Sequence, residues 1–451
     1  MKNTQSKNIF VMTTLAVALS SAFATMPAHA DDEERAALMQ PQNSVDAEVI
    51  TVGTSSPQFG QYNGLNRSGA YGNANIQFRA GDAYSDNENG GTTRVTIVGT
   101  DLGLSNRSAS AKYEDQGSWS VGVGYDALTH VIGTANGYQT PYGNGVGQNN
   151  FTLQPSFGSI TAAQTNGQLT TSTAYQAGSQ YMSSGQLSQF GPQTIETTRD
   201  NYSINGSYII DPQWSSTFDV NHLVQSGAKL MGFATATNSG SSITKNQSIS
   251  ILPNPTNYQT DTVNAALNWK GDAARFSLAY FGSFFRDGYN QVTWQPAFNS
   301  GATVGGAPSS YSATSIGAMQ TMSTMPSNMM NQIIMSGGYD FNEKQKLNGS
   351  FSWGVNTTGS GGTGYDSFMI VTSNGYNVPD FNGLVNLVHG DLKYTDRSIK
   401  DLTLSAMGKI DERNNLSSSN FYQFMSVGGA QALYPNTPMS WRKGVIELAG
   451  D

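Results

Sequence analysis

Apolar and polar side chains alternate along residues 261–286, and this period of two is the clearest pattern in the chain. The first half has an apolar face formed by Val263, Ala265, Leu267 and Trp269. Its opposite face is formed by Thr262, Asn264, Ala266 and Asn268. After a corner at 270–272 the alternation resumes, with an apolar face formed by Phe276, Leu278, Tyr280, Gly282 and Phe284. The pattern predicts two strands joined as a hairpin.

The length of this hairpin suits a lipid bilayer. Each arm is close to the roughly 9–11 residues that a tilted strand needs to cross a membrane. Trp269 and Phe276 flank the turn, and Phe284 and Phe285 lie at the far end, where the two membrane interfaces would be. Alternation alone also fits a hairpin of a soluble β-sandwich. Only the pattern in the rest of the chain can distinguish a soluble sandwich from a membrane-spanning hairpin.

Further strand pairs follow the same plan. Alternation predicts strands at 49–53, 75–79, 94–98, 108–113, 119–125, 202–210, 214–220, 331–341, 347–355, 384–394 and 399–410. Tight turns alternate with polar segments of about thirty residues or more, which is typical of outer-membrane barrels with short periplasmic turns and long extracellular loops. A soluble sandwich would show turn signals at both strand ends. The sequence therefore predicts an all-β fold, a transmembrane antiparallel β-barrel. Residues 128–199 are compatible with a long loop or with two weakly patterned strands.

The N-terminus has the features of a secretory signal. Lys2 and Lys7 precede an apolar stretch at 9–19, and Ala28-His29-Ala30 forms a small-x-small cleavage site. We predict a signal peptide at 1–30, a periplasmic N-terminal lead at 31–48 and a barrel at 49–451. The final segment, 441–451, is short and mixed and ends in Ala-Gly-Asp, so we expect a barrel that is incomplete at its C-terminus.

Composition narrows the function classes. Charged residues make up 12% of the chain, against about 25% in soluble domains. The net charge is −8, and near −10 without the two signal lysines, which argues against nucleic acid as a partner. The chain has no cysteine, so thiolate metal sites, a cysteine nucleophile and covalent haem attachment to this chain are excluded. We expect no cofactor to be bound by this chain.

Two local motifs match known binding loops only superficially. Residues 359–364 fit G-x-G-x-x-G, but no helix follows, so a flexible loop is the better interpretation. Asp82, Asp86, Glu88 and Gly90 depart from EF-hand spacing and indicate a solvated turn.

The remaining candidate chemistry is weak. His130, His222 and His389 are scattered; Asn221 precedes His222, but neighbours on a strand point to opposite faces, and no G-x-S-x-G is present. A lipase-like site is a minor alternative. Methionines cluster at Met319, Met322, Met325, Met329, Met330 and Met335. Thioethers can hold Cu(I), although an adaptable contact surface is the more common role. No residue is assigned to a catalytic, cofactor or metal site.

Several motifs resemble the MtrB/PioB family of outer-membrane barrels. These are Phe59-Gly60-Gln61-Tyr62-Asn63-Gly64-Leu65, Gly69-Ala70-Tyr71-Gly72, Leu102-Gly103-Leu104 with Arg107, Gln116-Gly117-Ser118-Trp119 with Tyr125, Tyr258-Gln259-Thr260-Asp261 through Phe281-Gly282-Ser283-Phe284-Phe285-Arg286, Thr293-Trp294-Gln295, Pro326-Ser327-Asn328 and Ser336-Gly337-Gly338-Tyr339. Together they touch most of the chain between about residues 34 and 409. The Cys-x-x-Cys that some family members carry near the N-terminus is absent.

The resemblance implies a function as well as a fold. Family members form barrels of about 26 strands, of which this chain would supply only a part. The barrel sheathes a periplasmic decahaem c-type cytochrome, often completed by an outer-surface multihaem cytochrome, so that electrons cross the outer membrane of a Gram-negative bacterium. We therefore expect a non-catalytic scaffold. The inner wall expected to face the lumen consists of Asn264, Asn268, Ser277, Ser283, Thr403, Ser405 and Lys409. A general or solute-selective porin with the same wall remains an alternative.

Overall fold

Strands make up most of the described part of the chain. The computed structural model describes residues 43–84, 90–133, 137–142, 148–153, 184–235, 248–289, 291–295, 320–358, 382–419, 421–423, 433–435 and 437–451. Helical structure within these residues is limited to the 3₁₀ turn η1 (Asp82–Tyr84) and the short α4 (Ser184–Leu187). No helix in the described ranges is long and apolar enough to cross a membrane.

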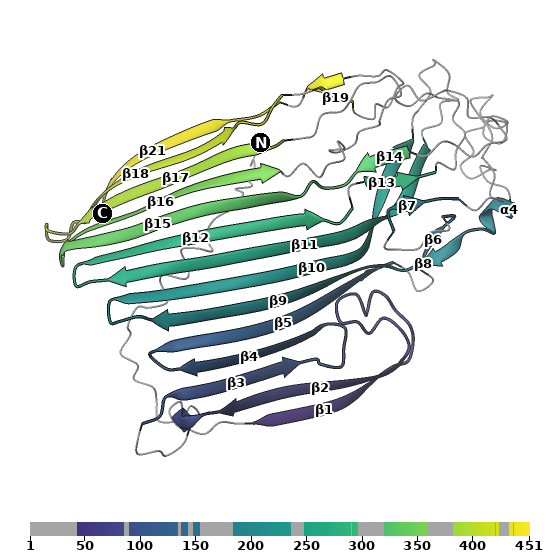
Figure 1. The fold of residues 1–451 in the computed structure, drawn as a ribbon, viewed down its shortest axis with the longest axis horizontal. Coiled ribbons are helices and arrows are strands. Elements are labelled where there is room, and N and C mark those ends of the chain that lie inside the picture. The colour runs from purple at the N-terminus through teal and green to yellow at the C-terminus, as the bar shows by residue number, and fades with distance from the viewer. Residues whose placement is uncertain are drawn as a thin grey trace, which may run out of the picture.

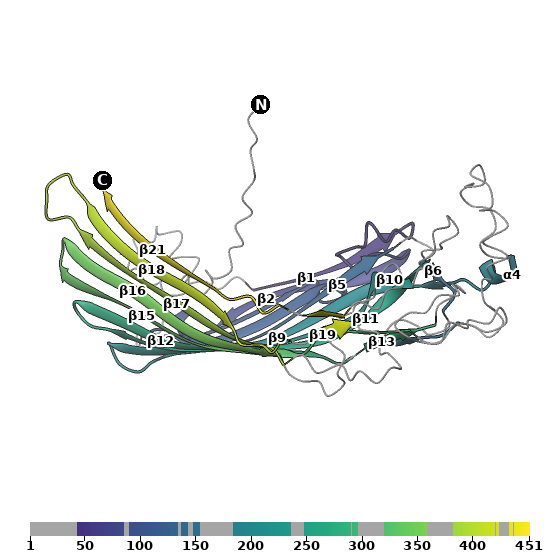
Figure 2. The same ribbon diagram turned by 90° about the horizontal axis from the view of Figure 1, so that it is seen from above.

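One antiparallel sheet of 14 strands forms the body of the molecule (Figure 1). In spatial order its strands are β1 (Ser44–Val52), β2 (Gly69–Ala80), β3 (Thr93–Thr100), β4 (Arg107–Asp115), β5 (Trp119–Ile132), β9 (Ile195–Ile209), β10 (Trp214–Thr235), β11 (Ser248–Lys270), β12 (Ala274–Asp287), β15 (Asn328–Asn342), β16 (Gln345–Thr358), β17 (Leu384–Asp396), β18 (Leu404–Asn415) and β21 (Trp441–Gly450). The sheet bends into a trough with β1 and β21 at its two edges (Figure 2). The predicted all-β antiparallel wall is confirmed.

The connections differ at the two ends of the strands. Short turns at 116–118, 210–213, 271–273, 343–344 and 397–403 join successive strands at one end. The other end carries the connections at 133–194, 288–327, 359–383 and 416–440. This asymmetry is the one expected from the sequence. The side with the short turns is the turn end of the sheet, and the opposite side is the loop end. The link between β3 and β4, at 101–106, is a short exception at the loop end.

Several strand boundaries depart from the expected ones. β1 begins at Ser44 rather than at 49, and β18 begins at Leu404 rather than at 399. β10 and β11 continue well beyond the alternating region, to Thr235 and from Ser248. Residues 441–450, expected to be mixed, form β21 and pair with β18. Backbone pairing requires no apolar alternation, so these extensions carry no sequence signal.

The most completely buried side chains lie at the loop end rather than in the wall. A small sheet of β14 (Gln320–Ser323), β13 (Gln291–Trp294) and β7 (Asn150–Phe151) lies beside the extended β10–β11 hairpin (Figure 1). Its apolar core is formed by Tyr142, Phe151, Leu153, Leu252, Val292 and Trp294. Two further strand pairs are β6 (Tyr138–Thr140) with β8 (Gly191–Gln193) and β19 (Phe421–Gln423) with β20 (Leu433–Pro435).

Some predicted features fall outside the described residues. These are the signal peptide at 1–30, the glycine-rich motif at 359–364, and Asp86, Glu88 and Met319. The boundaries of the lead and the barrel stay predictions.

Candidate functional site: the two faces of the wall

Cross-strand register fixes which side chains share a face. Leu267 lies opposite Leu278, which lies opposite Met335, and Ala265, Tyr280 and Ile333 are matched in the same way. Many large apolar side chains of this face are exposed, among them Leu278 and Ile333. In an antiparallel sheet, directly opposed residues point to the same side. The apolar rows therefore form one continuous outer face that requires an apolar surrounding.

Aromatic side chains mark the turn end of this outer face. Trp214 pairs with Trp269, and Trp269 pairs with Phe276. The rings of Trp214 and Trp269 are 6.4 Å apart between centroids. Farther along the wall, Phe341 lies between Tyr339 and Tyr394, at 4.9 and 6.2 Å. Such a row is the girdle expected where a barrel leaves the hydrocarbon layer.

Polar side chains limit the same face at the loop end. The His222 ring nitrogen Nδ1 and Asp261 Oδ1 are 2.6 Å apart, and Arg286 Nη2 donates to Asp261 Oδ2 at 2.7 Å. On the neighbouring strands, Tyr125 donates its hydroxyl to Asp200 at 2.8 Å. Charged groups are costly in hydrocarbon, so this outer polar row sets the upper limit of the lipid-facing band.

The spacing of the two rows fits a membrane. Trp269 and Asp261 are eight residues apart on β11, which is about 26 Å at about 3.3 Å per residue. A strand tilt of about 35–45° reduces this to about 20 Å, close to the apolar band of about 25 Å in outer-membrane barrels. The apolar face is therefore the lipid face.

The opposite face carries the polar side chains that we expected to line the lumen. Asn268 pairs with Ser277, and Thr262 pairs with Ser283. On the C-terminal strands, Lys409 pairs with Asp391. The register thus places the members of the predicted set that lie in strands on one side of the sheet, opposite to the aromatic rows, whereas Thr403 lies in the turn before β18.

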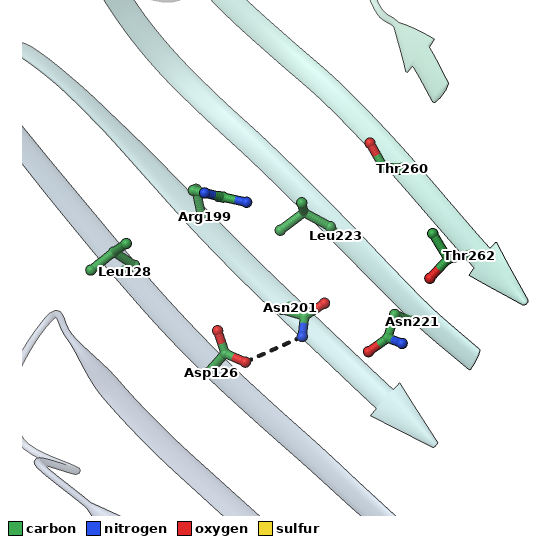
Figure 3. Close-up of a pocket in the computed structure, with 8 residues that line it drawn as sticks. All are labelled: Asp126, Leu128, Arg199, Asn201, Asn221, Leu223, Thr260 and Thr262. Atoms are coloured by element: carbon green, nitrogen blue, oxygen red, sulfur yellow. Dashed lines mark hydrogen bonds between the residues drawn. The ribbon is translucent and has the colours of Figure 1, made fainter. Parts of the chain in front are cut away.

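A shallow hollow of about 450 Å³ lies on this inner face near the loop end (Figure 3). The Asn201 side chain donates to Asp126 at 3.2 Å across one side of the hollow. The lining comes from β5, β9, β10 and β11 and consists of Asp126, Leu128, Arg199, Asn201, Asn221, Leu223, Thr260 and Thr262. Amide and hydroxyl groups beside two leucines suit contact with a polar surface, and no nucleophile–base pair is directed into the hollow among these residues.

The three histidines are not brought together. His130 stacks on Tyr62 at 4.6 Å and contacts Gln61. His222 lies on the lipid face, whereas Asn221 lines the inner hollow, so the two point to opposite sides as predicted.

His389 is the one histidine on the central inner wall. Its Nδ1 is 2.5 Å from Asp411 Oδ1, and its Nε2 is 3.4 Å from Asp391 Oδ1. Both ring nitrogens therefore face carboxylates rather than a hydroxyl. This arrangement is that of an ion-pair network and differs from the serine–histidine contact of a hydrolase.

The described methionines do not converge. Met329 and Met335 share the lipid face with Phe284 and Leu278, whereas Met330 lies opposite Ser283 on the inner face. No group of three or more His, Cys, Asp or Glu side chains in the described ranges has the spacing of a metal site.

The outer polar row was missed by sequence reasoning. Asp261 and Arg286 mark the two far ends of the predicted hairpin, and His222 ends the alternating part of the preceding strand. These three residues can be recognised as one row only once the strand register is known, because the register makes them neighbours.

Comparison with known proteins gives a consistent result. The family model for the outer membrane beta-barrel porin, MtrB/PioB, matches residues 52–451. A curated relative, the outer membrane protein MtrB of Shewanella baltica, is 23% identical over 387 residues, which cover 84% of this chain and 46% of the relative. The chain thus spans about half the length of that relative.

Solved structures resemble the chain only loosely. OmpT of Vibrio cholerae aligns over 84% of this chain and 88% of its own, with 8% identity and a TM-score of 0.22. The CymD monoaromatic hydrocarbon channel aligns over 82% of each chain, with 9% identity and a TM-score of 0.27.

Proposed function

Because the chain belongs to the MtrB/PioB family of outer-membrane β-barrel porins, we propose that it forms part of a barrel that holds a periplasmic multihaem c-type cytochrome within the outer membrane. Electrons would then cross about 30 Å of hydrocarbon through haems carried by that partner. The chain acts as a non-catalytic scaffold, exported by its signal peptide to the outer membrane of a Gram-negative cell. An outer-surface multihaem cytochrome is a further partner.

Family membership carries this proposal, and the geometry of the wall supports it. A haem protein presents polar groups that lipid cannot satisfy, whereas the inner face offers Asn264, Asn268 and Ser277 as hydrogen-bonding groups. The chain contains no cysteine, so covalently attached haem has to belong to the partner.

Purification from the membranes of its own cells tests the proposal. The barrel is extracted in mild detergent by an affinity tag, and the absorption spectrum is recorded before and after reduction with dithionite. We expect a c-type haem spectrum that co-elutes with the barrel, and a tagged unrelated porin from the same membranes serves as the control. Ion conductance in planar bilayers from a barrel without haem would favour the porin alternative.

A further inference from the structure

The outer polar row is continuous across neighbouring strands of the lipid face. Register pairs Tyr125 with Tyr202, Tyr202 with His222, and His222 with Asp261. The rings of Tyr125 and Tyr202 are 5.1 Å apart between centroids, and those of Tyr202 and His222 are 6.2 Å apart. These side chains therefore form one polar and aromatic band that runs from β5 to β11.

An arginine lies at either end of this band. On β12, Arg286 donates from Nη2 to Asp261 at 2.7 Å. On β4, Arg107 lies opposite Ala127, two residues from Tyr125 on the same face of β5. Arg107 Nη2 donates to the Tyr125 hydroxyl at 3.4 Å, and its guanidinium carbon is 5.8 Å from the centre of that ring. Each arginine is thus held against the wall by a neighbour that accepts one of its N–H groups.

The band borders directly on apolar side chains. Two residues nearer the turn end, register places Val123, Ile204, Val220 and Val263 in a single row. Val123 and Ile204 are exposed there. Hydrocarbon suits these side chains but not a guanidinium group, and a long arginine side chain can extend to carry its charge out of the hydrocarbon. The two arginines therefore lie at the level where acyl chains end and lipid headgroups begin.

Basic side chains occur at only one of the two interfaces of the lipid face. In the 14 strands of the sheet, the turn end of this face carries two charged residues, Asp115 and Asp396, and neither is basic. The loop end carries Arg107 and Arg286 and, on the last strand, Arg442. Arginine attracts anionic headgroups, so this distribution favours contact with such headgroups at the loop end.

The geometry around Asp261 leaves the guanidinium of Arg286 accessible. The Arg286 side chain is 62% exposed and that of Asp261 is 25% exposed, so an approaching group meets the guanidinium before the carboxylate. Asp261 also lies 2.6 Å from His222 Nδ1, so its two oxygens are both engaged. Arginine has five N–H donors in a planar fork that matches phosphate oxygens, and the bond to Asp261 uses Nη2 alone among the described contacts.

We propose that the outer polar row binds phosphate groups of anionic lipids in the leaflet at the loop end, with Arg107 and Arg286 as the donors. Tyr125 and Asp261 hold the two guanidinium groups in place. The arginines are five strand spacings apart, which is about 24 Å at about 4.8 Å each, so they bind separate phosphates. The inference goes beyond the proposed function, because these lipids lie on the face of the wall that is opposite to the lumen.

Binding of a labelled lipid tests this site. The barrel is purified in detergent from its own membranes and titrated with fluorescent lipid A, a glycolipid that carries phosphate monoesters, and fluorescence anisotropy gives the apparent Kd. Arg107→Gln with Arg286→Gln removes both donors. Arg397→Gln with Lys400→Gln is the control, since it makes the same charge change on exposed turn residues. We expect an apparent Kd at least about tenfold higher for the first pair, and an unchanged Kd for the control.

Competition identifies the chemical group that is bound. Unlabelled phosphatidic acid should displace lipid A from the wild-type barrel, whereas oleate, which is anionic but has no phosphate, should not. Equal displacement by both lipids would overturn the phosphate site, as would equal affinities of the arginine pair and the control.

The single variants Arg107→Gln and Arg286→Gln, each with an intermediate Kd, keep the test valid if the double variant does not fold. Folding is checked by the mobility shift of the unheated barrel in gel electrophoresis. The haem that co-elutes with the barrel is recorded for every variant and should be unchanged, because the substitutions face away from the lumen. Loss of the lipid site would therefore leave the proposed function intact.

Discussion

Gly227 allows a backbone conformation and a close contact between β10 and β9 that a residue with a side chain would not. It lies in β10 with φ of 113°, a conformation that favours glycine. A Cβ added there would lie 2.1 Å from the Glu196 carbonyl oxygen on β9. The pairing of β10 with β9 ends at Gly227, and beyond it β10 continues past the lipid-facing band paired with β11.

Replacing this glycine should weaken the sheet. We expect Gly227→Ala to lower the free energy of unfolding by about 2 kcal/mol or more, because backbone strain and a clash add together. Gly444→Ala is the matched control, since its Cβ would meet no atom within 4 Å. Urea unfolding in detergent, followed by tryptophan fluorescence, measures both variants. A Gly227→Ala barrel as stable as the control would contradict this account.

Asp396 gives a pH-dependent contribution at the turn end, outside the lipid-facing band. The Ser398 hydroxyl, the Ser398 backbone N–H and the Gln345 amide donate to its carboxylate and lower its pKa below the usual value. A lowered pKa stabilises the fold above the unfolded pKa of about 3.9, and this stabilisation is lost as the pH falls through the folded pKa. The stability difference between wild type and Asp396→Ala should therefore be constant between about pH 5 and 7 and shrink below about pH 4. An unchanged difference at pH 3 would refute the hydrogen-bonded role.

At the scale of an element, the β11–β12 hairpin separates lipid from lumen by alternation alone. Ala265 and Ala266 are adjacent in sequence, yet Ala265 pairs with Tyr280 on the lipid face and Ala266 with Ala279 on the inner face. Ala265 lies midway between the Trp269 and Asp261 levels that bound the apolar band. The two alanines therefore differ in surroundings rather than in chemistry.

Arginine substitutions at Ala265 and Ala266 should destabilise the barrel to different extents, because one side chain faces lipid and the other faces the lumen. We expect Ala265→Arg to destabilise the barrel by about 2–4 kcal/mol, because it places a charge at the bilayer midplane. Ala266→Arg should cost less than about 1 kcal/mol, because its side chain reaches water or polar groups. Both are measured by urea unfolding in phospholipid vesicles. Equal losses would mean that the assigned lipid face is wrong.

At the scale of the whole molecule, turns and long connections lie at opposite ends of one curved sheet (Figure 1). The family places the sheet in the outer membrane, and barrels of this kind direct short turns to the periplasm. The loop-end sheet of β7, β13 and β14, with Trp294 only 1% exposed in its core, would then lie on the cell exterior.

Single cysteines can establish this orientation, because the sequence contains no cysteine. Met325→Cys, at a position 58% exposed at the loop end, should react on intact cells with a bulky, membrane-impermeant maleimide. Asp272→Cys, in the exposed turn between β11 and β12, should react only after the outer membrane is opened. The reverse pattern would show that the sheet is inserted the other way.

The sequence by itself determined the all-β class, the two faces of the wall and the asymmetry of its connections, because a lipid-facing strand must alternate and tight turns need particular residues. It did not reveal the extensions of β10 and β11, since backbone pairing outside lipid leaves no periodic signal. It did not reveal β21 either, because Arg442 and Gly444 interrupt the apolar alternation on the face that carries Ile446 and Leu448. Only the tertiary structure placed His222, Asp261 and Arg286 in one outer row and put His389 between Asp391 and Asp411 on the inner wall. Both groups join residues of different strands, and their proximity depends on register, which is set when the strands pair.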